Sequence, residues 1–328
     1  MKFGVWIPSY CYPELTYERT QREVGDFARK ANDLGIDLWV IDHLLHASGL
    51  YGMPWLEPMT VLTWAGALAP DVKLGTGILV LPLRNPVILA KEIATLDYLT
   101  GGRFTLGIGP GWYPDEFTAV GNRIEERGER TDEIFDAVRR LLSEEHVTFE
   151  GKHYRFEDVT IEPRPPKVPQ IWVSGGSRVP DPEYHDVPVL AKSVLRRIVR
   201  SDGWLSRCSG NQELVKRDWE TIKEALVAEG RSPDTFPFGH TNFTYLVDTS
   251  DRDKALDVQR PFFEQVMGTH RTFDHLQECY LLGSVDDIVA RLKDLESAGC
   301  EYAVLGPTSD DLGQLDLIAE RIVPNFGA

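Results

Sequence analysis

Two residues able to take part in acid–base chemistry are adjacent in the sequence, after a short apolar run. Asp42 and His43 follow the run at positions 38–41. An imidazole titrates near neutral pH, so His43 could carry a proton or donate a hydrogen bond to a cofactor. The alternative is that Asp42 caps the following segment and that His43 is solvated. Spacing alone leaves both interpretations open.

Glycines interrupt or end two other apolar runs, at positions 72–81 and 104–109. Glycine in a buried strand marks a bulge or a close approach of the backbone to a ligand, although tight packing against a helix has the same signature. The second run ends in GxGxG rather than GxGxxG, so it does not indicate a nicotinamide-binding domain. Glycines followed by Trp112 at a strand end could instead admit a flat ring system.

Two further segments carry polar groups at the end of an apolar run. Ser174-Gly175-Gly176-Ser177 offers clustered backbone N–H groups that suit a phosphate, although an ordinary turn has the same composition. His240 could face the same end of the fold, but a lone histidine in a strand is more often a structural residue. The four cysteines show no CxxC or HExxH spacing, so the sequence indicates neither a metal site nor a disulfide framework.

The elements that must position these residues alternate between short strands and helices. The strands are continuously apolar, which is typical of a parallel sheet buried on both faces. Each half of the chain supplies four of them, so a (β/α)8 TIM barrel is favoured over an open doubly wound sheet. The expected strands lie at 3–8, 37–42, 72–81, 104–109, 170–174, 203–205, 238–247 and 302–305.

Three segments depart from this alternation within what we expect to be a single domain over 1–328. Residues 147–163 form a hairpin excursion, and insertion loops occupy 177–186 and 261–282. Because the loops after barrel strands build active sites, these insertions are expected at the C-terminal face. The expected substrate pocket is formed by Trp6, Tyr10, Trp55 and His240, and the polar residues of 261–282 indicate a polar or anionic group on the ligand.

Composition excludes several classes of protein. The 328 residues carry 35 Lys+Arg and 51 Asp+Glu, a formal net charge of −16. This acidity disfavours binding to nucleic acid or to anionic membranes. No apolar run is long enough to span a membrane, and the first residues do not resemble a signal peptide, so a cytoplasmic location is expected.

The ordered set of motifs resembles the luciferase-like superfamily of flavin- and deazaflavin-dependent oxidoreductases. The most specific stretches lie at 74–112, 125–135, 149–156, 171–177 and 201–207. The resemblance covers nearly the whole chain. It implies a (β/α)8 barrel with insertions that holds a flavin at its C-terminal mouth.

The resemblance also assigns roles to individual residues. It places Asp42 and His43 near the reactive edge of the ring, and it implies a non-prolyl cis peptide at the bulge of the third strand. Ser174 and Gly175 would shape the phosphate-binding turn. The residues expected under the ring are Gly75, Thr76 and Gly77, those along the cofactor wall are Gly109, Gly111 and Trp112, and those at the phosphate are Gly176 and Ser177.

The function that this resemblance favours is a two-component FMN-dependent monooxygenase. It would use reduced FMN and O2 on a small organic substrate, with a separate NAD(P)H:flavin reductase and a homodimeric assembly. The alternative is a coenzyme F-420 (deazaflavin) oxidoreductase that transfers hydride, and a minor alternative is a non-catalytic flavin-binding barrel. One deazaflavin-dependent sugar-phosphate dehydrogenase subgroup has a catalytic Glu where this sequence has Trp112, which argues against that subgroup's chemistry.

Overall fold

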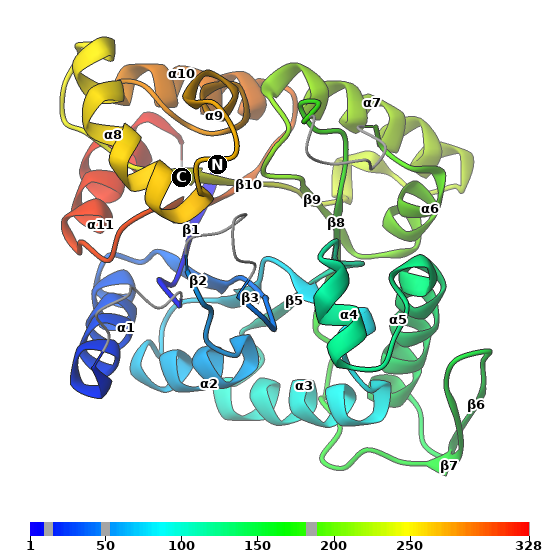
Figure 1. Cartoon of the computed structure of the whole chain (residues 1–328). Helices are drawn as coiled ribbons and strands as arrows, with labels where there is room; N and C mark the ends of the chain where they lie inside the picture. Colours follow the sequence, from blue (N-terminus) through cyan, green and yellow to red (C-terminus); the bar gives the residue numbers. More distant parts are fainter. Residues whose placement is uncertain (10–15, 47–52, 182–188, 328) are drawn as a thin grey trace.

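Parallel strands form a closed barrel surrounded by helices (Figure 1). The computed structural model describes residues 1–9, 16–46, 53–181 and 189–327. Neighbouring strands follow the order β3-β2-β1-β11-β10-β9-β8-β5-β4, and a further pairing of β3 with β5 closes the sheet. The strands are β1 (Lys2–Trp6), β2 (Asp37–Val40), β3 (Leu74–Thr76), β4 (Leu79–Val80), β5 (Phe104–Gly109), β8 (Gln170–Gly175), β9 (Gly203–Ser206), β10 (Phe238–Thr244) and β11 (Tyr302–Pro307).

β3 and β4 are successive segments of one barrel strand, which leaves eight strand positions and confirms the predicted (β/α)8 fold. The peptide bond between Gly77 and Ile78, which joins the two segments, is cis. Helices cover the outside of the barrel (Figure 1). They are α1 (Tyr17–Asp33), α2 (Pro58–Leu68), α3 (Pro86–Thr100), α5 (Arg127–Ser143), α6 (Lys192–Arg200), α7 (Gln212–Ala228), α8 (Arg252–Met267), α10 (Val285–Ser297) and α11 (Gly313–Leu317).

The excursions from the barrel are partly as expected. β6 (Val147–Glu150) and β7 (Arg155–Val159) form an antiparallel hairpin at the periphery, within the predicted range 147–163 (Figure 1). The range 261–282, expected as a loop, is largely helical: α8 continues through Pro261 to Met267, and α9 covers Phe273–Cys279. Residues 182–186 of the predicted loop 177–186 lie outside the described residues, as do residues 187 and 188.

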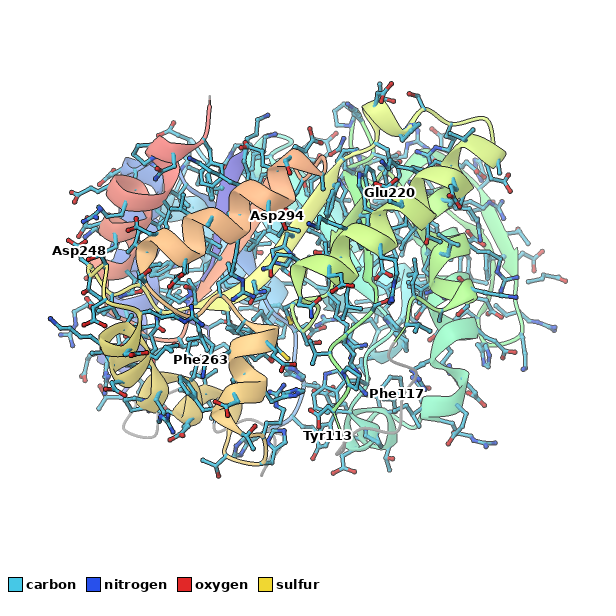
Figure 2. All side chains as sticks on the ribbon, turned by 90° about the horizontal axis from the view of Figure 1, so that it is seen from above. Tyr113, Phe117, Glu220, Asp248, Phe263 and Asp294 are labelled. Atoms are coloured by element: carbon cyan, nitrogen blue, oxygen red, sulfur yellow. The ribbon has the colours of Figure 1, made fainter. Side chains whose placement is uncertain are left out.

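Short helices lie at the end of the barrel where the strands finish. α4 (Pro114–Ala119) follows β5 directly. Figure 2 places Tyr113 and Phe117, beside and on α4, at the same end of the molecule as Phe263 of α8. No helix among the described residues is both long enough and apolar enough to cross a lipid bilayer.

Aromatic side chains fill the interior of the barrel. Trp39 donates a hydrogen bond of 3.0 Å from Nε1 to the hydroxyl of Tyr302, which in turn donates to Asp37 at 2.6 Å. A Cβ atom at Gly75 would lie 2.5 Å from the Trp39 ring. Gly75 is therefore required by packing against this indole of the neighbouring strand β2, which is neither of the two interpretations offered by the sequence, a close approach to a ligand or packing against a helix.

The hydroxyl of Thr76 joins the interrupted third strand to its neighbour. Oγ1 donates to the carbonyl of Gly107 at 2.8 Å and accepts from the Gly107 N–H at 2.9 Å. A Cβ at Gly107 would lie 1.9 Å from the Thr76 carbonyl oxygen, so only glycine fits there. This side chain thus satisfies two β5 backbone groups at the point where the β3 ladder ends.

His240 is another buried polar side chain of the barrel. Its Nδ1 lies 2.6 Å from Ser206 Oγ and its Nε2 lies 3.2 Å from Asn242 Nδ2. Burial, together with the charge of Arg291, lowers the pKa of His240 to about 3. The imidazole is therefore neutral at physiological pH and part of the internal hydrogen-bond network.

Replacement of Thr76 by valine tests the strand junction. Thr76→Val keeps the side-chain shape but leaves the N–H and C=O of Gly107 buried without this partner. We expect a loss of about 3 kcal/mol in the free energy of unfolding, measured by urea denaturation. Thr76→Ser keeps the hydroxyl and should cost only about 1 kcal/mol for the lost methyl group. Equal losses in the two variants would contradict the role of the hydroxyl.

The lowered pKa of His240 predicts acid sensitivity. The unfolded chain binds a proton near pH 6.5, whereas the folded chain does so only near pH 3. The contribution of His240 to the free energy of unfolding is fully present above pH 6.5. It declines as the pH falls, by about 2 kcal/mol between pH 7 and pH 5. His240→Asn should remove this decline in urea titrations at the two pH values. His146 is exposed, so the control variant His146→Asn should retain the decline. If stability declines as steeply in His240→Asn as in the wild type, His240 is not the group responsible.

Candidate active site

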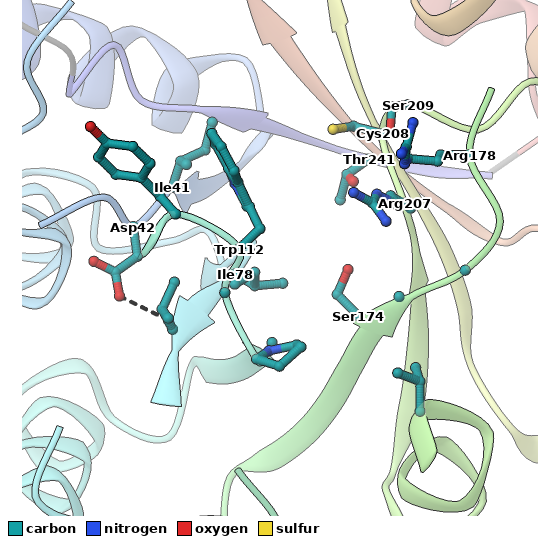
Figure 3. Close-up of a pocket in the computed structure, with 18 of the residues that line it drawn as sticks. Ile41, Asp42, Ile78, Trp112, Ser174, Arg178, Arg207, Cys208, Ser209 and Thr241 are labelled. Carbon is teal, nitrogen blue, oxygen red and sulfur yellow. Dashed lines mark hydrogen bonds between the residues drawn. The ribbon is translucent and has the colours of Figure 1, made fainter. Parts of the chain in front are cut away.

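The C-terminal ends of the strands open into a cavity of about 930 Å³. Its lining comes from the segments that follow β2, β5, β8 and β9, together with β10, α6 and α9. Figure 3 shows residues from opposite sides of this cavity, with Trp112 and Ile41 on one side and Arg178 and Arg207 on the other. This is the position at which barrel enzymes carry their catalytic residues.

His43 and Glu116 form a buried pair at the edge of the cavity. The side chain of His43 is 8% exposed and that of Glu116 is 1% exposed. Glu116 Oε1 lies 3.2 Å from His43 Nδ1 and accepts hydrogen bonds from the N–H groups of Leu44 and Leu45 at 2.7 and 3.2 Å. When Nδ1 donates to this carboxylate, Nε2 is the nitrogen that can accept a proton.

Sequence analysis did not identify Glu116. It lies 73 residues from His43, on the short helix α4 that follows the glycines of β5. The available signal was an acidic residue in the first turn of a helix that begins shortly after a strand end. The ring of His43 also packs near Trp55 and Trp112, with centroid distances of 5.4 and 5.8 Å.

Asp42 lines the cavity, but its carboxylate is engaged by the third strand. Oδ2 accepts from the N–H of Val80 at 2.8 Å, the bond drawn in Figure 3, and Arg84 donates to both carboxylate oxygens at 3.1 and 3.2 Å. Burial raises the pKa of Asp42, while Arg84 and the Val80 N–H oppose that shift. These contacts tie the end of β2 to β4.

The ends of the third and fourth barrel strands form one side of the cavity. Gly77, Gly109, Gly111 and Trp112 line it, whereas Gly75 and Thr76 are not among its lining residues. The space beside them is tight, because a Cβ at Gly109 would lie 2.8 Å from Ile78 Cδ1. Glycine here keeps the backbone close to the cavity surface.

Trp6 and Trp55 also line the cavity. Nε1 of Trp6 is buried and has no hydrogen-bond partner within the part of the chain that the structure describes. The same atom would lie 2.9 Å from a Cβ at Gly77, so this donor lies beside the strand interruption. Tyr10 lies outside the described residues, and His240 is not among the lining residues because its ring nitrogens face Ser206 and Asn242.

The turn after β8 divides into two parts. Ser174, Gly175 and Gly176 line the cavity, and the two glycines have φ angles of 156° and 145° that favour glycine. Residues at the N-terminus of α6, Ala191, Ser193 and Val194, line the adjoining surface. Backbone N–H groups at a helix N-terminus are suited to an anion.

Ser177, the last residue of this predicted motif, is 1% exposed and does not appear in the cavity lining. Its hydroxyl donates to Asp218 Oδ1 at 2.7 Å, and its N–H also donates to Asp218. Leu190 N–H donates to the same hydroxyl at 3.2 Å. The buried carboxylate of α7 therefore holds Ser177 in the protein interior.

Within the described residues, no three His, Cys, Asp or Glu side chains converge as a metal site would require. The cavity instead combines glycine-lined strand ends, aromatic rings, a His–Glu pair and a helix N-terminus. These groups can accommodate a flat ring with an anionic tail and can hold a proton beside it.

Comparisons with known proteins agree with this arrangement. The model of the luciferase-like monooxygenase family matches residues 1–302. An F420-dependent glucose-6-phosphate dehydrogenase of Kineococcus radiotolerans is 38% identical over 64% of this chain, an alignment that covers 60% of that relative. An FMNH(2)-dependent dimethylsulfone monooxygenase of Pseudomonas fluorescens is 27% identical over 79% of this chain and 68% of the relative.

A solved structure gives the same result at the level of the whole fold. The monooxygenase RslO1 from Streptomyces bottropensis superposes with a TM-score of 0.81 at 25% identity, over 100% of both chains. The relatives are named as enzymes that use either F420 or FMNH(2). The protein is therefore an oxidoreductase or monooxygenase that uses a flavin-type cofactor, and the chain belongs to the luciferase-like monooxygenase family.

Proposed function

We propose that this protein is the oxygenating component of a two-component monooxygenase, which uses reduced FMN and O2 to oxidise a small organic substrate. The observation that carries the proposal is the cavity of about 930 Å³ at the strand ends, in which glycine backbone, aromatic rings and the His43–Glu116 pair meet. A separate NAD(P)H:flavin reductase would supply the reduced cofactor. The homodimer and the cytoplasmic location stay predictions.

The ring of the cofactor would lie against the strand ends at Gly77, Ile78 and Gly109. Side chains are small or absent there, so the backbone can contact a planar surface. The buried N–H of Trp6, beside Gly77, is available to donate a hydrogen bond to a ring heteroatom. Trp112, across the GxGxG turn, would form the wall at the ring edge.

The phosphate would lie between the turn after β8 and the first turn of α6. Gly175 and Gly176 provide backbone N–H groups, and Ser193 provides a hydroxyl at the second position of the helix. The helix dipole favours an anion at this end. Ser174 would shape the turn, and Ser177 would support it through Asp218 rather than contact the phosphate.

The side chains of this cavity would orient the bound molecules, exclude water from the reacting centre and hold a proton. Reduced FMN supplies two electrons to O2 when it is bound. The rings of Trp6, Trp55 and Trp112 would exclude water from the reacting centre. His43 would hold and release a proton at Nε2, while Glu116 fixes the imidazole through Nδ1.

A coenzyme F-420 oxidoreductase is the second candidate, and the name of the relative from Kineococcus radiotolerans favours it. The same cavity and phosphate position would serve a deazaflavin. In that case the deazaflavin would supply a hydride acceptor, and His43 would take the proton of a substrate hydroxyl. The two candidates differ in which cofactor binds and in whether O2 is consumed.

Cofactor titration distinguishes the candidates. We expect purified protein to bind FMN with a micromolar or lower dissociation constant, measured by the absorption and fluorescence of the flavin, and to consume O2 when reduced FMN and substrate are supplied. If the protein binds F420 and has no affinity for FMN, the monooxygenase proposal is wrong and the deazaflavin-dependent alternative is supported. Binding of neither cofactor would refute both.

The phosphate position has its own test. Ser193→Asp places a carboxylate in the first turn of α6, where it is compatible with the helix but repels a phosphate. We expect the dissociation constant of the cofactor to rise at least about tenfold, while thermal stability is maintained. Ser193→Ala is the matched control and should bind nearly as well as the wild type. If Ser193→Asp binds the cofactor as tightly as the wild type, the phosphate does not lie at this position.

Replacement of His43 tests the proton-holding role. His43→Ala should lower kcat by roughly 10²–10⁴ while the dissociation constant of the cofactor stays within about twofold. Glu116→Gln keeps an acceptor for Nδ1 but removes the charge, so a smaller loss in kcat is expected. Turnover at the wild-type rate in His43→Ala would exclude this imidazole from the mechanism.

A further inference from the structure

Two consecutive residues of α7, Asp218 and Trp219, lie behind the turn that follows β8. Both are 4% exposed, and neither is among the residues that line the cavity. α7 lies beside α6 on the outside of the barrel (Figure 1). The contacts of these two residues therefore reach the turn from the protein interior rather than from the cavity.

Asp218 binds Ser177 at two points. Its Oδ1 accepts from the Ser177 hydroxyl at 2.7 Å, and its Oδ2 accepts from the Ser177 N–H. A Cβ atom at Gly176 would lie 2.9 Å from Oδ2, so the carboxylate also approaches the backbone of the preceding residue. Hydrogen bonds to a carboxylate are stronger than those between neutral groups, and two of them fix both the position of Ser177 and the orientation of its N–H.

The hydroxyl of Ser177 extends this contact to the start of α6. Besides donating to Asp218, it accepts from the Leu190 N–H and from Arg217 Nη2, each at 3.2 Å. Leu190 directly precedes Ala191, the N-cap residue of α6. One buried hydroxyl thus joins the turn after β8, α7 and the residue before the N-cap of α6, and its donor and both of its acceptor positions are used.

Trp219 supports the other end of the turn through a second indole. The rings of Trp204 and Trp219 stack at a centroid distance of 6.0 Å and an interplanar angle of 7°. Trp204 Nε1 donates to the carbonyl of Gly175 at 2.9 Å. A Cβ atom at Gly175 would lie 2.5 Å from Val194 Cγ1, so this glycine packs directly against the first turn of α6. Contacts that lead back to α7 therefore lie on both sides of Gly176.

This support matters for an anion because backbone N–H groups bind one only when they are held in a fixed arrangement. Gly175 and Gly176 have positive φ angles, and glycine loses more conformational freedom on ordering than any other residue. If the turn became ordered only when a ligand binds, that loss would reduce the affinity. The contacts with α7 order the turn when the protein folds, so the loss does not oppose binding.

We propose that Asp218 is a positioning residue for the anionic tail of the cofactor, and that it makes the protein select a phosphorylated cofactor over the same ring without its phosphate. Asp218 holds Ser177 so that the N–H groups of the turn and of α6 face one point. It does not contact the phosphate, which a neighbouring carboxylate would repel. The proposal rests on the proposed function for the phosphate position, and it adds a residue of the outer helix and a selectivity.

Comparison of FMN with riboflavin tests the proposal, because the two molecules differ only in the phosphate. We expect the wild type to bind FMN at least about tenfold more tightly than riboflavin, measured by flavin fluorescence. In Asp218→Ala the affinity for FMN should fall roughly tenfold, while the affinity for riboflavin stays within about twofold. If Asp218→Ala keeps the wild-type ratio of the two affinities, the positioning role is wrong and the proposed function stands.

Failure of the proposed function gives a different result. If the wild type binds FMN and riboflavin equally well, the phosphate is not held at this turn, and both the phosphate position and the role of Asp218 are wrong. If the protein binds F420 rather than FMN, the same ratio is measured with F420 and the same deazaflavin without its phosphate. If it binds neither cofactor, both proposals are refuted.

Asp287→Ala is the matched control. Asp287 accepts from the N–H and the hydroxyl of Ser284 at 2.9 and 2.8 Å, the same pair of contacts, at the start of α10 and outside the cavity lining. This variant should lose stability but keep the wild-type ratio of the affinities for FMN and riboflavin. If the ratio falls in Asp287→Ala as much as in Asp218→Ala, the effect is one of general stability, and the proposal is overturned.

Two milder variants are used if Asp218→Ala does not fold. Asp218→Asn keeps an acceptor for the Ser177 N–H, and Ser177→Ala keeps that N–H contact but loses the hydroxyl, so each should lower the ratio by a smaller factor. Hydrogen exchange of segment 174–177 in the cofactor-free protein should be faster in both than in Asp287→Ala. Wild-type ratios in both variants, or exchange as slow as in the control, would overturn the proposal.

Discussion

The site depends on how the barrel closes at its third strand. β3 ends at Thr76 and β4 begins at Leu79, and between them the backbone leaves the regular ladder and faces the cavity. Such a gap would leave polar groups of β5 unpaired in the interior, and the Thr76 hydroxyl satisfies both the N–H and the C=O of Gly107. The barrel can therefore remain closed while it presents bare backbone at its mouth.

The rest of the site is built around this opening by residues that are distant in the sequence. Asp42 ties β2 to the segment after the gap through the Val80 N–H. Glu116 fixes His43 from the short helix after β5. On the far side, the turn after β8 and the N-terminus of α6 supply backbone N–H groups that suit an anion. The cavity would thus accommodate a flat ring and its anionic tail, as proposed above.

The sequence predicted the fold well because continuous apolar runs and helical periodicity are local properties. It also identified several residues of the cavity surface, since glycines and polar residues at strand ends are visible in the chain. It failed where a residue's role depends on a distant partner. Ser177 was expected at a phosphate, but Asp218, 41 residues away, holds it in the interior. The contact of Gly75 with Trp39 was also not visible in the sequence, and the placement of Gly75 under the ring stays a prediction. The partner of His43 was missed for the same reason.

The central claim is that a planar redox ring lies across Gly77, Ile78 and Gly109 with its phosphate at the N-terminus of α6. A crystal structure of the protein soaked with FMN, or with F420 if FMN does not bind, tests it most directly. The account predicts electron density for the ring against these strand ends and for the phosphate beside Gly175, Gly176 and Ser193. Cofactor density outside this cavity, or a phosphate seated on Arg207 and Arg271, would contradict it.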